Sequence, residues 1–223
     1  YESDWSQAEP RLFAHYSGDK ALVEGYSSNP PRDMHQITAD AMNVDRGYTG
    51  KRMGMGLLTG MQPKTFAQHM GWDVATAQYY FDEWFKLFPG IQGFQQKAKD
   101  VIKSRGYVKT ILGRKCRLES PRFAYRAVSR IIQGSQADMM KLVILRVDEM
   151  LEAENDEVQL LMSVHDSYEW QAPANEYGQK MSSEIVRILE DVQSNPINLR
   201  IPFVCETNKG PNWAVATFGE EVG

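Results

Sequence analysis

The sequence predicts an α+β fold in which a mainly helical insertion separates two parts of one β-sheet. Strand-like stretches lie near both ends of the 223 residues, at residues 1–6 and again from residue 158 onward. The stretch between them repeats apolar residues at intervals of three and four, which is the period of α-helices.

The first third of the chain predicts one strand and three helices. A short strand over residues 1–6 leads into a helix over residues 9–16, and two prolines at residues 30–31 mark a boundary between lobes. Helices are expected over residues 33–42 and about 45–61, the second of them unusually rich in glycine.

The middle third predicts two helices and a hairpin. Aromatic and aliphatic residues repeat at helical spacing over residues 74–88, and Pro89-Gly90 is expected to end that helix. Another helix is expected over residues 93–104, and residues 106–118 have the composition of a β-hairpin.

The last third predicts two helices, a second hairpin and a final strand. The longest apolar repeat runs over residues 137–151, and a shorter one runs over residues 177–192. The hairpin is expected between them, over residues 158–172, and residues 201–206 are expected to form the last strand.

The hairpin at residues 158–172 carries the most informative polar residues. The apolar residues within 160–164 have the composition of a buried strand, and Tyr168 and Trp170 alternate with polar residues on the way back. Because an ionised carboxylate at the end of an apolar strand is unfavourable without a cation, Asp166 is a candidate metal ligand. The alternative is a turn aspartate beside a histidine at the edge of the core.

The composition is typical of a globular protein in a reducing compartment. Apolar residues make up 42% and charged residues 24% of the chain, and no run is long enough for a membrane span or a signal peptide. The two cysteines, Cys116 and Cys205, set no disulfide framework beyond a single bridge. A cytoplasmic location without a membrane partner is therefore expected.

Basic residues concentrate in one segment, although the formal net charge is −4. Residues 97–130 contain eleven Lys and Arg against two acidic residues, a net charge of +9 that leaves −13 on the remainder. Such a segment can hold a phosphate backbone, and the alternative is a solvated basic face.

Asp4, like Asp166, lies where a short strand is expected to end. Two strand-borne aspartates can meet across adjacent strands of one sheet and hold a pair of divalent ions. Such a pair aligns the attacking and leaving oxygens in phosphoryl transfer. An oxygen-only site favours Mg²⁺ over Zn²⁺, and the chain has no zinc-type spacing of cysteine and histidine.

A glycine-rich stretch over residues 46–60 offers positive charge to a phosphate group. Two residues separate its first two glycines and an arginine follows Lys51, so the spacing excludes a P-loop. What remains is a helix that presents Lys51 with Arg46 or Arg52 nearby, which suits a triphosphate.

Three segments match known catalytic motifs in the correct order. The segment Asp4-Trp-Ser-Gln-Ala-Glu9-Pro-Arg11 resembles the first catalytic motif of family A DNA polymerases, the bacterial polymerase I class. Residues 51–60 resemble their nucleotide-binding fingers helix, and Val164-His165-Asp166 resembles their final catalytic motif. Further matches span nearly the whole chain: Asp33-Met-His35, Phe88-Pro-Gly90, Gly106-Tyr-Val108, Gln133-Gly-Ser-Gln-Ala-Asp138 and Gly210-Pro-Asn-Trp213.

The resemblance implies a right-hand polymerase architecture. An antiparallel palm sheet with packed helices would carry a mainly helical fingers insertion, and the thumb and exonuclease would be absent from this chain. The implied parts are residues 1–30 for the first part of the palm, 31–132 for the fingers, and 133–223 for the second part of the palm.

The resemblance also implies a template-directed DNA polymerase of DNA replication. Asp4 and Asp166, with the backbone carbonyl of Trp5, would bind two Mg²⁺, for which Mn²⁺ could substitute. Nucleotidyl transfer from a dNTP to a primer 3′-hydroxyl would follow the two-metal mechanism. Lys51 would be the third catalytic residue and would protonate the leaving pyrophosphate.

Further contacts follow from the same resemblance. Glu9 resembles the gate that excludes a ribose 2′-hydroxyl. The other implied nucleotide-binding residues are His35, Arg46, Lys51, Arg52, Met55 and Thr59. The implied primer- or template-binding residues are Arg11, Gln133, His165 and Arg114. The basic segment would lie beside the duplex and contact its phosphates.

The chain departs from the family pattern at three places. Four residues separate Arg46 from Lys51, where the family usually has three. Met55 and Thr59 stand where the family normally has aromatic residues that stack on the incoming base. Ser167 replaces the acidic residue that commonly follows the catalytic aspartate.

Two other functions compete with this interpretation. The Lys51-Arg52 pair and Ser167 also resemble single-subunit phage-type RNA polymerases, but a carboxylate at the sugar gate, Glu9, favours deoxynucleotides. A non-catalytic nucleic-acid-binding subunit would gain nothing from two close buried carboxylates.

The expected partners are primer–template DNA, dNTP and a source of the missing thumb and exonuclease. That source would be a second chain or an N-terminal segment, so the chain would be part of a larger or split enzyme. The divergent fingers helix favours a phage or viral origin, with action in the host cytoplasm.

Overall fold

The computed structural model describes residues 1–153, 157–193 and 197–219. Contacts divide the chain into two compact units, which we call the sheet unit and the helical unit. The sheet unit consists of Tyr1–Ala8, Gln136–Asn198 and Pro202–Gly223, and the helical unit of Glu9–Ser135 and Leu199–Ile201. Because this division groups residues by contact and not by function, the palm and fingers boundaries at residues 30 and 132 stay predictions.

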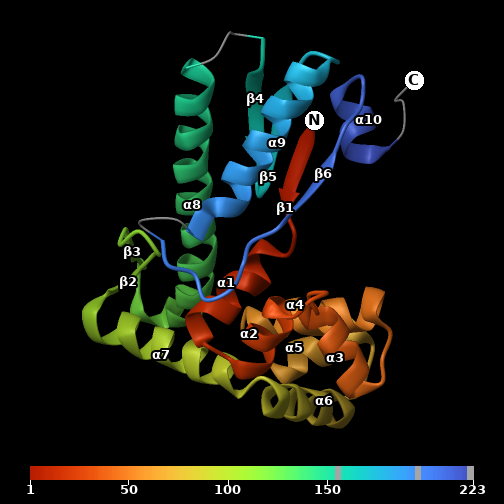
Figure 1. The fold of residues 1–223 in the computed structure, drawn as a ribbon. Coiled ribbons are helices and arrows are strands. Elements are labelled where there is room, and N and C mark those ends of the chain that lie inside the picture. Colours follow the sequence, from red (N-terminus) through yellow and green to blue (C-terminus); the bar gives the residue numbers. More distant parts are fainter. Residues whose placement is uncertain (154–156, 194–196, 220–223) are drawn as a thin grey trace. The chain divides into compact units, whose positions relative to one another are not determined.

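The sheet unit is built on a four-stranded antiparallel sheet with the strand order β4-β5-β1-β6 (Figure 1). β1 (Glu2–Trp5) comes from the start of the chain. β4 (Gln159–Val164), β5 (Ser167–Gln171) and β6 (Cys205–Asn208) come from its last third. The prediction that a helical insertion separates two parts of one sheet is therefore confirmed.

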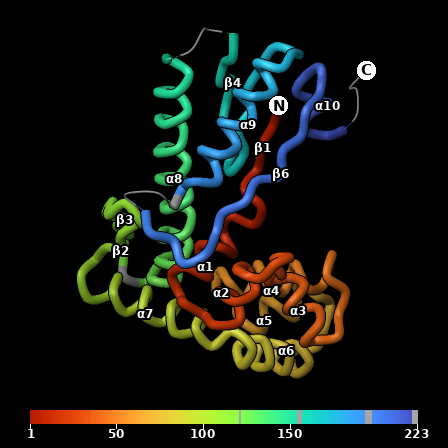
Figure 2. The backbone as a smooth tube through the Cα atoms, in the orientation of Figure 1, coloured from red at the N-terminus to blue at the C-terminus, as the bar shows by residue number. Residues whose placement is uncertain are grey.

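Two helices of the sheet unit run beside the sheet and hold its buried aromatic residues (Figure 2). α8 (Ala127–Glu152) begins in the helical unit, and α9 (Glu176–Glu190) follows the hairpin. The Trp5 indole donates to the Leu189 carbonyl at 2.9 Å, and the Tyr168 hydroxyl donates to the Met140 carbonyl at 2.9 Å. Because these donors anchor β1 and β5 to the helices, the opposite face of the sheet is left to the polar side chains of the same strands.

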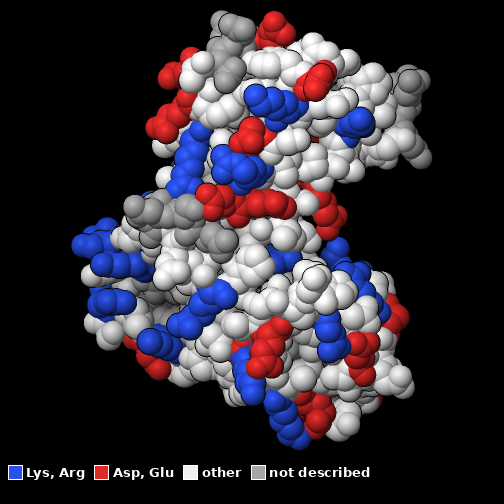
Figure 3. Space-filling view, in the orientation of Figure 1, with Lys and Arg blue, Asp and Glu red and all other residues white. Residues whose placement is uncertain are grey.

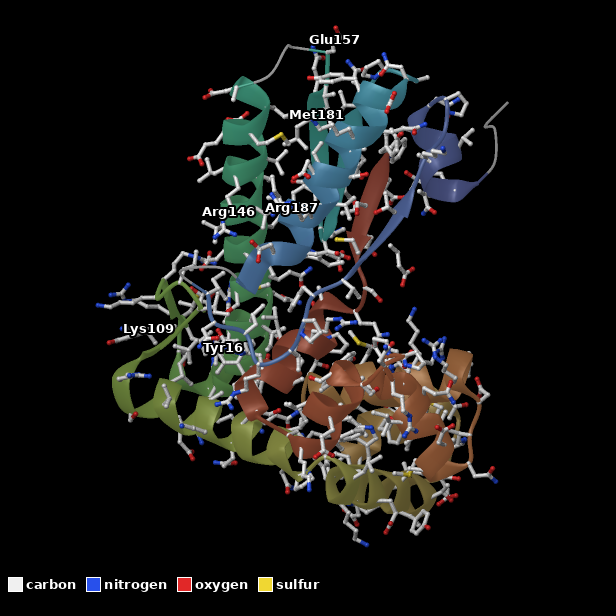
Figure 4. All side chains as sticks on the ribbon, in the orientation of Figure 1. Tyr16, Lys109, Arg146, Glu157, Met181 and Arg187 are labelled. Atoms are coloured by element: carbon white, nitrogen blue, oxygen red, sulfur yellow. The ribbon has the colours of Figure 1, made fainter. Side chains whose placement is uncertain are left out.

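A side-chain hydrogen bond links α8 to the segment that follows α9. Arg146 of α8 donates to the Asp191 carbonyl at 3.1 Å, in the short η3 (Asp191–Gln193) after α9 (Figure 4).

A last helix, α10 (Trp213–Phe218), begins where the Asn212 side chain accepts from the Val215 N–H. α10 was not predicted from the sequence. In the described part of the chain, no helix is long and apolar enough to cross a membrane.

The helical unit contains the remaining elements. They are α1 (Ala8–Ser17), α2 (Lys20–Ser27), α3 (Met34–Met42), η1 (Arg46–Gly50), α4 (Lys51–Leu58), α5 (Pro63–Met70), α6 (Val74–Leu87), α7 (Pro89–Arg105), β2 (Tyr107–Lys109), β3 (Lys115–Arg117) and η2 (Pro121–Arg126). Aspartates at positions 19, 33, 45 and 73 accept backbone N–H groups at the starts of α2, α3, η1 and α6. Such caps fix where each helix begins.

The structure corrects details of three predicted elements. The apolar strand β4 is not buried, because it is the edge strand of the sheet, and Leu161, Met162 and Val164 are 54%, 40% and 43% exposed. The helix expected over 45–61 is a turn of π-helix followed by α4. Pro89-Gly90 ends α6 as predicted, but the helix expected from residue 93 already begins at Pro89, since proline is tolerated in the first turn of a helix.

Candidate active site

The two aspartates of the predicted site lie on neighbouring strands of the sheet unit. Asp4 pairs with Ser167 across β1 and β5, and the Trp5 N–H donates to the Asp166 carbonyl at 3.1 Å. The end of β1 therefore meets the turn of the β4–β5 hairpin, and the structure brings Asp4 and Asp166 together.

Other carboxylates surround this pair. Residues directly opposite each other in antiparallel strands project from one face, which places Glu206 of β6 beside Asp4. Burial and then the charge of Asp166 raise the pKa of Asp4 to about 6, and Glu2 and Glu206 add to the rise. Burial also raises the pKa of Asp166. A cation between the two carboxylates would relieve this unfavourable charge.

The turn that carries Asp166 has an unusual backbone conformation. Val164 and Ser167 form the last pair of the hairpin, so His165 and Asp166 are its two turn residues. His165 has a φ of 58°, a left-handed conformation that histidine adopts more readily than most side chains. The His165 side chain is exposed, and its contact with primer or template stays a prediction.

The aspartate pair has the properties of a cation site with few protein ligands. The Asp4 Oδ1 atom is buried and has no hydrogen-bond partner among the described residues. Within those residues, no three His, Cys, Asp or Glu side chains are grouped so that they could hold a metal ion alone. An ion here would complete its shell with backbone carbonyl, water or substrate oxygens, which is the coordination that Mg²⁺ prefers. The residues therefore fit a hard divalent ion that shares its coordination with a substrate.

In the helical unit, His35 and Arg46 lie beside one another. The Arg46 guanidinium forms an ion pair with Asp33, the residue that caps α3 immediately before His35. His35 is 4% exposed, and its Nδ1 atom has no hydrogen-bond partner in the described part of the chain. Burial lowers the pKa of His35; the charge of Asp33 opposes this shift, and the charges of Arg46 and Lys51 add to it. The shifted spacing of Arg46 therefore still leaves it near His35 and Lys51.

The other predicted nucleotide-binding residues of α4 border a cavity of about 530 Å³. Arg52 and Met55 of α4 and its C-terminal cap, Thr59, line one side of it. Phe66 and Met70 of α5 line it as well. The Arg52 guanidinium stacks on the Tyr48 ring at 4.0 Å. The cavity lies beside both positions where the sequence lacks an expected aromatic residue.

Glu9 and Gln133, far apart in sequence, meet in the helical unit. The Gln133 amide donates to Glu9 Oε1 at 3.5 Å, and Arg114 donates to the adjacent Gly134 carbonyl at 2.9 Å. On the same stretch of helix, the Ser135 hydroxyl lies 2.7 Å from the hydroxyl of Tyr16 (Figure 4). The structure therefore brings three of the predicted contact residues, Glu9, Gln133 and Arg114, to one region of α1 and α8.

Arg11 differs from the other predicted contacts with primer or template. It is 3% exposed, and its guanidinium stacks on the Tyr26 ring at 4.6 Å. Burial lowers the pKa of Arg11. A buried guanidinium in this position supports the packing of α1 against α2, and its contact with nucleic acid stays a prediction.

One buried carboxylate of the sheet unit was not predicted from the sequence. Glu169 was expected on a polar face of β5, but it is 2% exposed, and the Ser167 hydroxyl donates to its Oε1 atom at 2.8 Å. The alternation of β5 already placed Ser167 and Glu169 on the same face, which was the available signal.

Comparison with known proteins identifies the family. The sequence model of DNA polymerase family A matches residues 1–215. DNA polymerase DpoZ of Acinetobacter phage SH-Ab 15497 is 30% identical over 96% of this chain, and DNA polymerase I of Streptococcus pneumoniae serotype 4 is 27% identical over 95%. The chain spans 38% of the length of the first protein and 25% of the second.

A solved structure has the same fold. The POL domain of Pol1 from M. smegmatis, in complex with DNA primer-template and dNTP, superposes with a TM-score of 0.86 at 23% sequence identity. The match covers 96% of this chain and 40% of that chain. Since the family match also extends over nearly all of the sequence, this chain belongs to DNA polymerase family A.

Proposed function

We propose that this chain is the catalytic part of a template-directed DNA polymerase that transfers a nucleotide from a dNTP to a primer 3′-hydroxyl. The pairing of Asp4 and Asp166 at the end of β1 and the tip of the hairpin carries the proposal. Family membership supports the reaction, and the Pol1 domain bound to primer-template and dNTP supports the substrates. Because the relatives are longer, a preceding segment or a second chain would supply the thumb and exonuclease.

Family A DNA polymerases use divalent metal ions, and we assign the ligands of this chain. Asp4, Asp166 and the Trp5 carbonyl would hold two Mg²⁺, with Mn²⁺ as a substitute. When bound, such ions supply positive charge to the attacking and leaving oxygens of phosphoryl transfer. The unpartnered Asp4 Oδ1 and the raised pKa of both aspartates support this assignment, because each is unfavourable without a cation.

The helical unit would bind the nucleotide. Lys51, exposed at the start of α4, would neutralise the triphosphate and give a proton to the leaving pyrophosphate. Arg46 and His35 would contact the same phosphates. Figure 3 shows Lys and Arg side chains gathered over β2, β3 and α7, a surface that would hold the phosphates of the primer–template duplex.

Action in the cytoplasm, or the host cytoplasm for a phage protein, agrees with two free cysteines.

Primer extension with Mg²⁺ tests the proposal directly. The protein is expected to extend a DNA primer with deoxynucleotides in preference to ribonucleotides, and Asp166→Ala is expected to abolish extension. A preference for ribonucleotides would instead indicate an RNA polymerase. Undiminished extension by Asp166→Ala would exclude the aspartate pair as the active site, and binding of DNA without any extension would indicate a non-catalytic subunit.

Substitutions at Glu9 separate its bulk from its charge. If the Glu9 side chain excludes a 2′-hydroxyl by its volume, Glu9→Ala should relax the discrimination against ribonucleotides by about 10- to 100-fold. Glu9→Gln keeps the volume and the neighbouring Gln133, and should therefore retain most of the discrimination. The kcat/KM ratio for the two nucleotide types measures both effects, and equal losses in the two variants would exclude a steric gate.

The raised pKa of Asp4 predicts a pH dependence of metal binding. Protons and a divalent ion compete for the same oxygens, and Asp4 has a pKa of about 6 without metal. Mn²⁺ affinity should therefore fall by up to about tenfold per pH unit below that value. Electron paramagnetic resonance of free Mn²⁺ measures this affinity. Because Glu206 helps to raise this pKa, Glu206→Gln should move the fall to lower pH. A fall only below about pH 4, where ordinary aspartates titrate, would contradict the prediction.

A further inference from the structure

Glu169 is a buried carboxylate that the reaction described so far does not use. Its Oε1 atom accepts the hydrogen bond from Ser167, whereas its Oε2 atom is buried and receives no well-aligned hydrogen bond within the described ranges, although the Trp213 side chain approaches the carboxylate. A buried carboxylate with an unpaired oxygen is unfavourable for folding. Its position in the sheet offers a role that would offset this cost.

The register of the sheet places Glu169 beside the aspartate pair. Asp4 lies opposite Ser167, and Glu169 is the next residue of β5 on the same face. Diagonal neighbours across an antiparallel pair lie about 7–8 Å apart, within reach of long side chains. Glu169 also lines a cavity of about 340 Å³ together with Leu161 and Trp213, which gives water access to this side of the sheet.

Ser167 connects Glu169 to the turn that carries Asp166. Its hydroxyl lies 2.8 Å from Glu169 Oε1 and 3.0 Å from the Val164 carbonyl oxygen, and it shares its one proton between these two acceptors. Val164 and Ser167 are the residues immediately before and after the turn. A hydroxyl held in this way bridges both ends of the turn, so the position of Asp166 depends on the Glu169 carboxylate that orients the hydroxyl.

We propose that Glu169 is a positioning residue of the divalent-metal site. Through the Ser167 hydroxyl it fixes the turn of Asp166, and its negative charge raises the affinity of the aspartate pair for the ion. This inference rests on the proposed function, because it requires that Asp4 and Asp166 hold divalent ions.

Mn²⁺ binding to the nucleotide-free protein, measured by paramagnetic resonance, tests the inference without relying on activity. Glu169→Gln keeps the shape of the side chain and should weaken Mn²⁺ binding by about tenfold or more. It should raise the Mg²⁺ concentration needed for half-maximal primer extension in proportion, with little change in kcat at saturating Mg²⁺. The midpoint of thermal unfolding should not fall, because the variant removes a buried charge.

Three further variants make the test specific. Ser167→Ala breaks the link but keeps the charge, and should weaken Mn²⁺ binding less than Glu169→Gln. The double variant Ser167→Glu with Glu169→Gln moves the carboxylate along the same face and should regain most of the affinity. Glu206→Gln removes an exposed carboxylate beside Asp4 and, at neutral pH, should weaken Mn²⁺ binding less than Glu169→Gln does, since exposed charges are screened.

Two results would overturn the inference. One is wild-type Mn²⁺ affinity in Glu169→Gln, and the other is an equal loss in Glu206→Gln, which would indicate a general charge effect. The variant Asp166→Ala distinguishes these two results from a failure of the proposed function. If Asp166→Ala loses Mn²⁺ binding and extension while Glu169→Gln is unchanged, only the inference fails. If Asp166→Ala keeps both, the metal site and the inference fail together.

Discussion

Replacing Asp4 or Asp166 with asparagine is expected to lower the rate of primer extension by about 10³-fold or more. Asparagine keeps the size of the side chain but removes the charge that would hold a divalent ion. The two residues are expected to act as one unit, so the double variant should be scarcely slower than either single variant. Single-turnover primer extension at saturating Mg²⁺ measures the effect.

The same substitutions should stabilise the protein near neutral pH when no metal is present. The folded-state pKa of Asp4 is about 6, above the unfolded value of 3.8, so stability falls as pH rises between these values and the unfavourable charge is fully present above them. Asp4→Asn should therefore raise the midpoint of thermal unfolding near neutral pH and leave it unchanged below about pH 4.

These paired effects distinguish an active site from a structural pair. A variant that lost activity and also lost stability at neutral pH would show that the carboxylates support the fold. Asp40→Asn is a matched control, because Asp40 is an exposed aspartate that pairs with Arg32 on the surface of the helical unit. It should change neither extension nor stability by more than a small amount.

Adding aromatic rings to α4 is expected to tighten nucleotide binding. The family resemblance implies aromatic residues that stack on the base at the positions of Met55 and Thr59, and both residues border the cavity of about 530 Å³. Stacking of a base on a ring is worth about 1–3 kcal/mol, so Met55→Phe and Thr59→Tyr should each lower the dNTP concentration for half-maximal extension by about five- to a hundredfold. Steady-state kinetics with each dNTP measures the change.

Met70→Phe is the matched control for these substitutions. Met70 lines the same cavity from α5, so a ring there fills similar space without the helix position that would face a base. An equal improvement in Met70→Phe would attribute the gain to cavity filling. No improvement in either variant would mean that the proposed nucleotide site does not use stacking at these positions.

The sequence was sufficient to predict the aspartate pair because local pattern and chemistry agree there. Asp4 lies near the end of β1 and Asp166 follows β4, and two strand ends meet when their strands belong to one sheet. The pairing itself, with Asp4 opposite Ser167, is a non-local property that no short pattern contains. Family resemblance supplied what periodicity could not, and the geometry agrees with it at this pair.

The sequence was insufficient where burial depends on distant neighbours. The apolar residues of β4 looked buried but lie on an edge strand, whereas the polar Glu169 of the next strand is covered. Arg11 looked like a surface contact but stacks on Tyr26 of α2. The helices α2 and α5 are eight residues each, too short for a clear period, and their starts depend on a capping aspartate and a proline.

The position of β1 between β5 and β6 has a consequence for the order in which this chain folds during synthesis. Ser3 of β1 meets Thr207 of β6, 204 residues later, and within the described residues the strand that carries Asp4 pairs with β5 and β6, both of which are synthesised in the last third of the chain. Residues 9–135 form nearly all of the helical unit and can compact much earlier. Because closing so long a loop is slow, catalytic competence is expected to be the last property acquired.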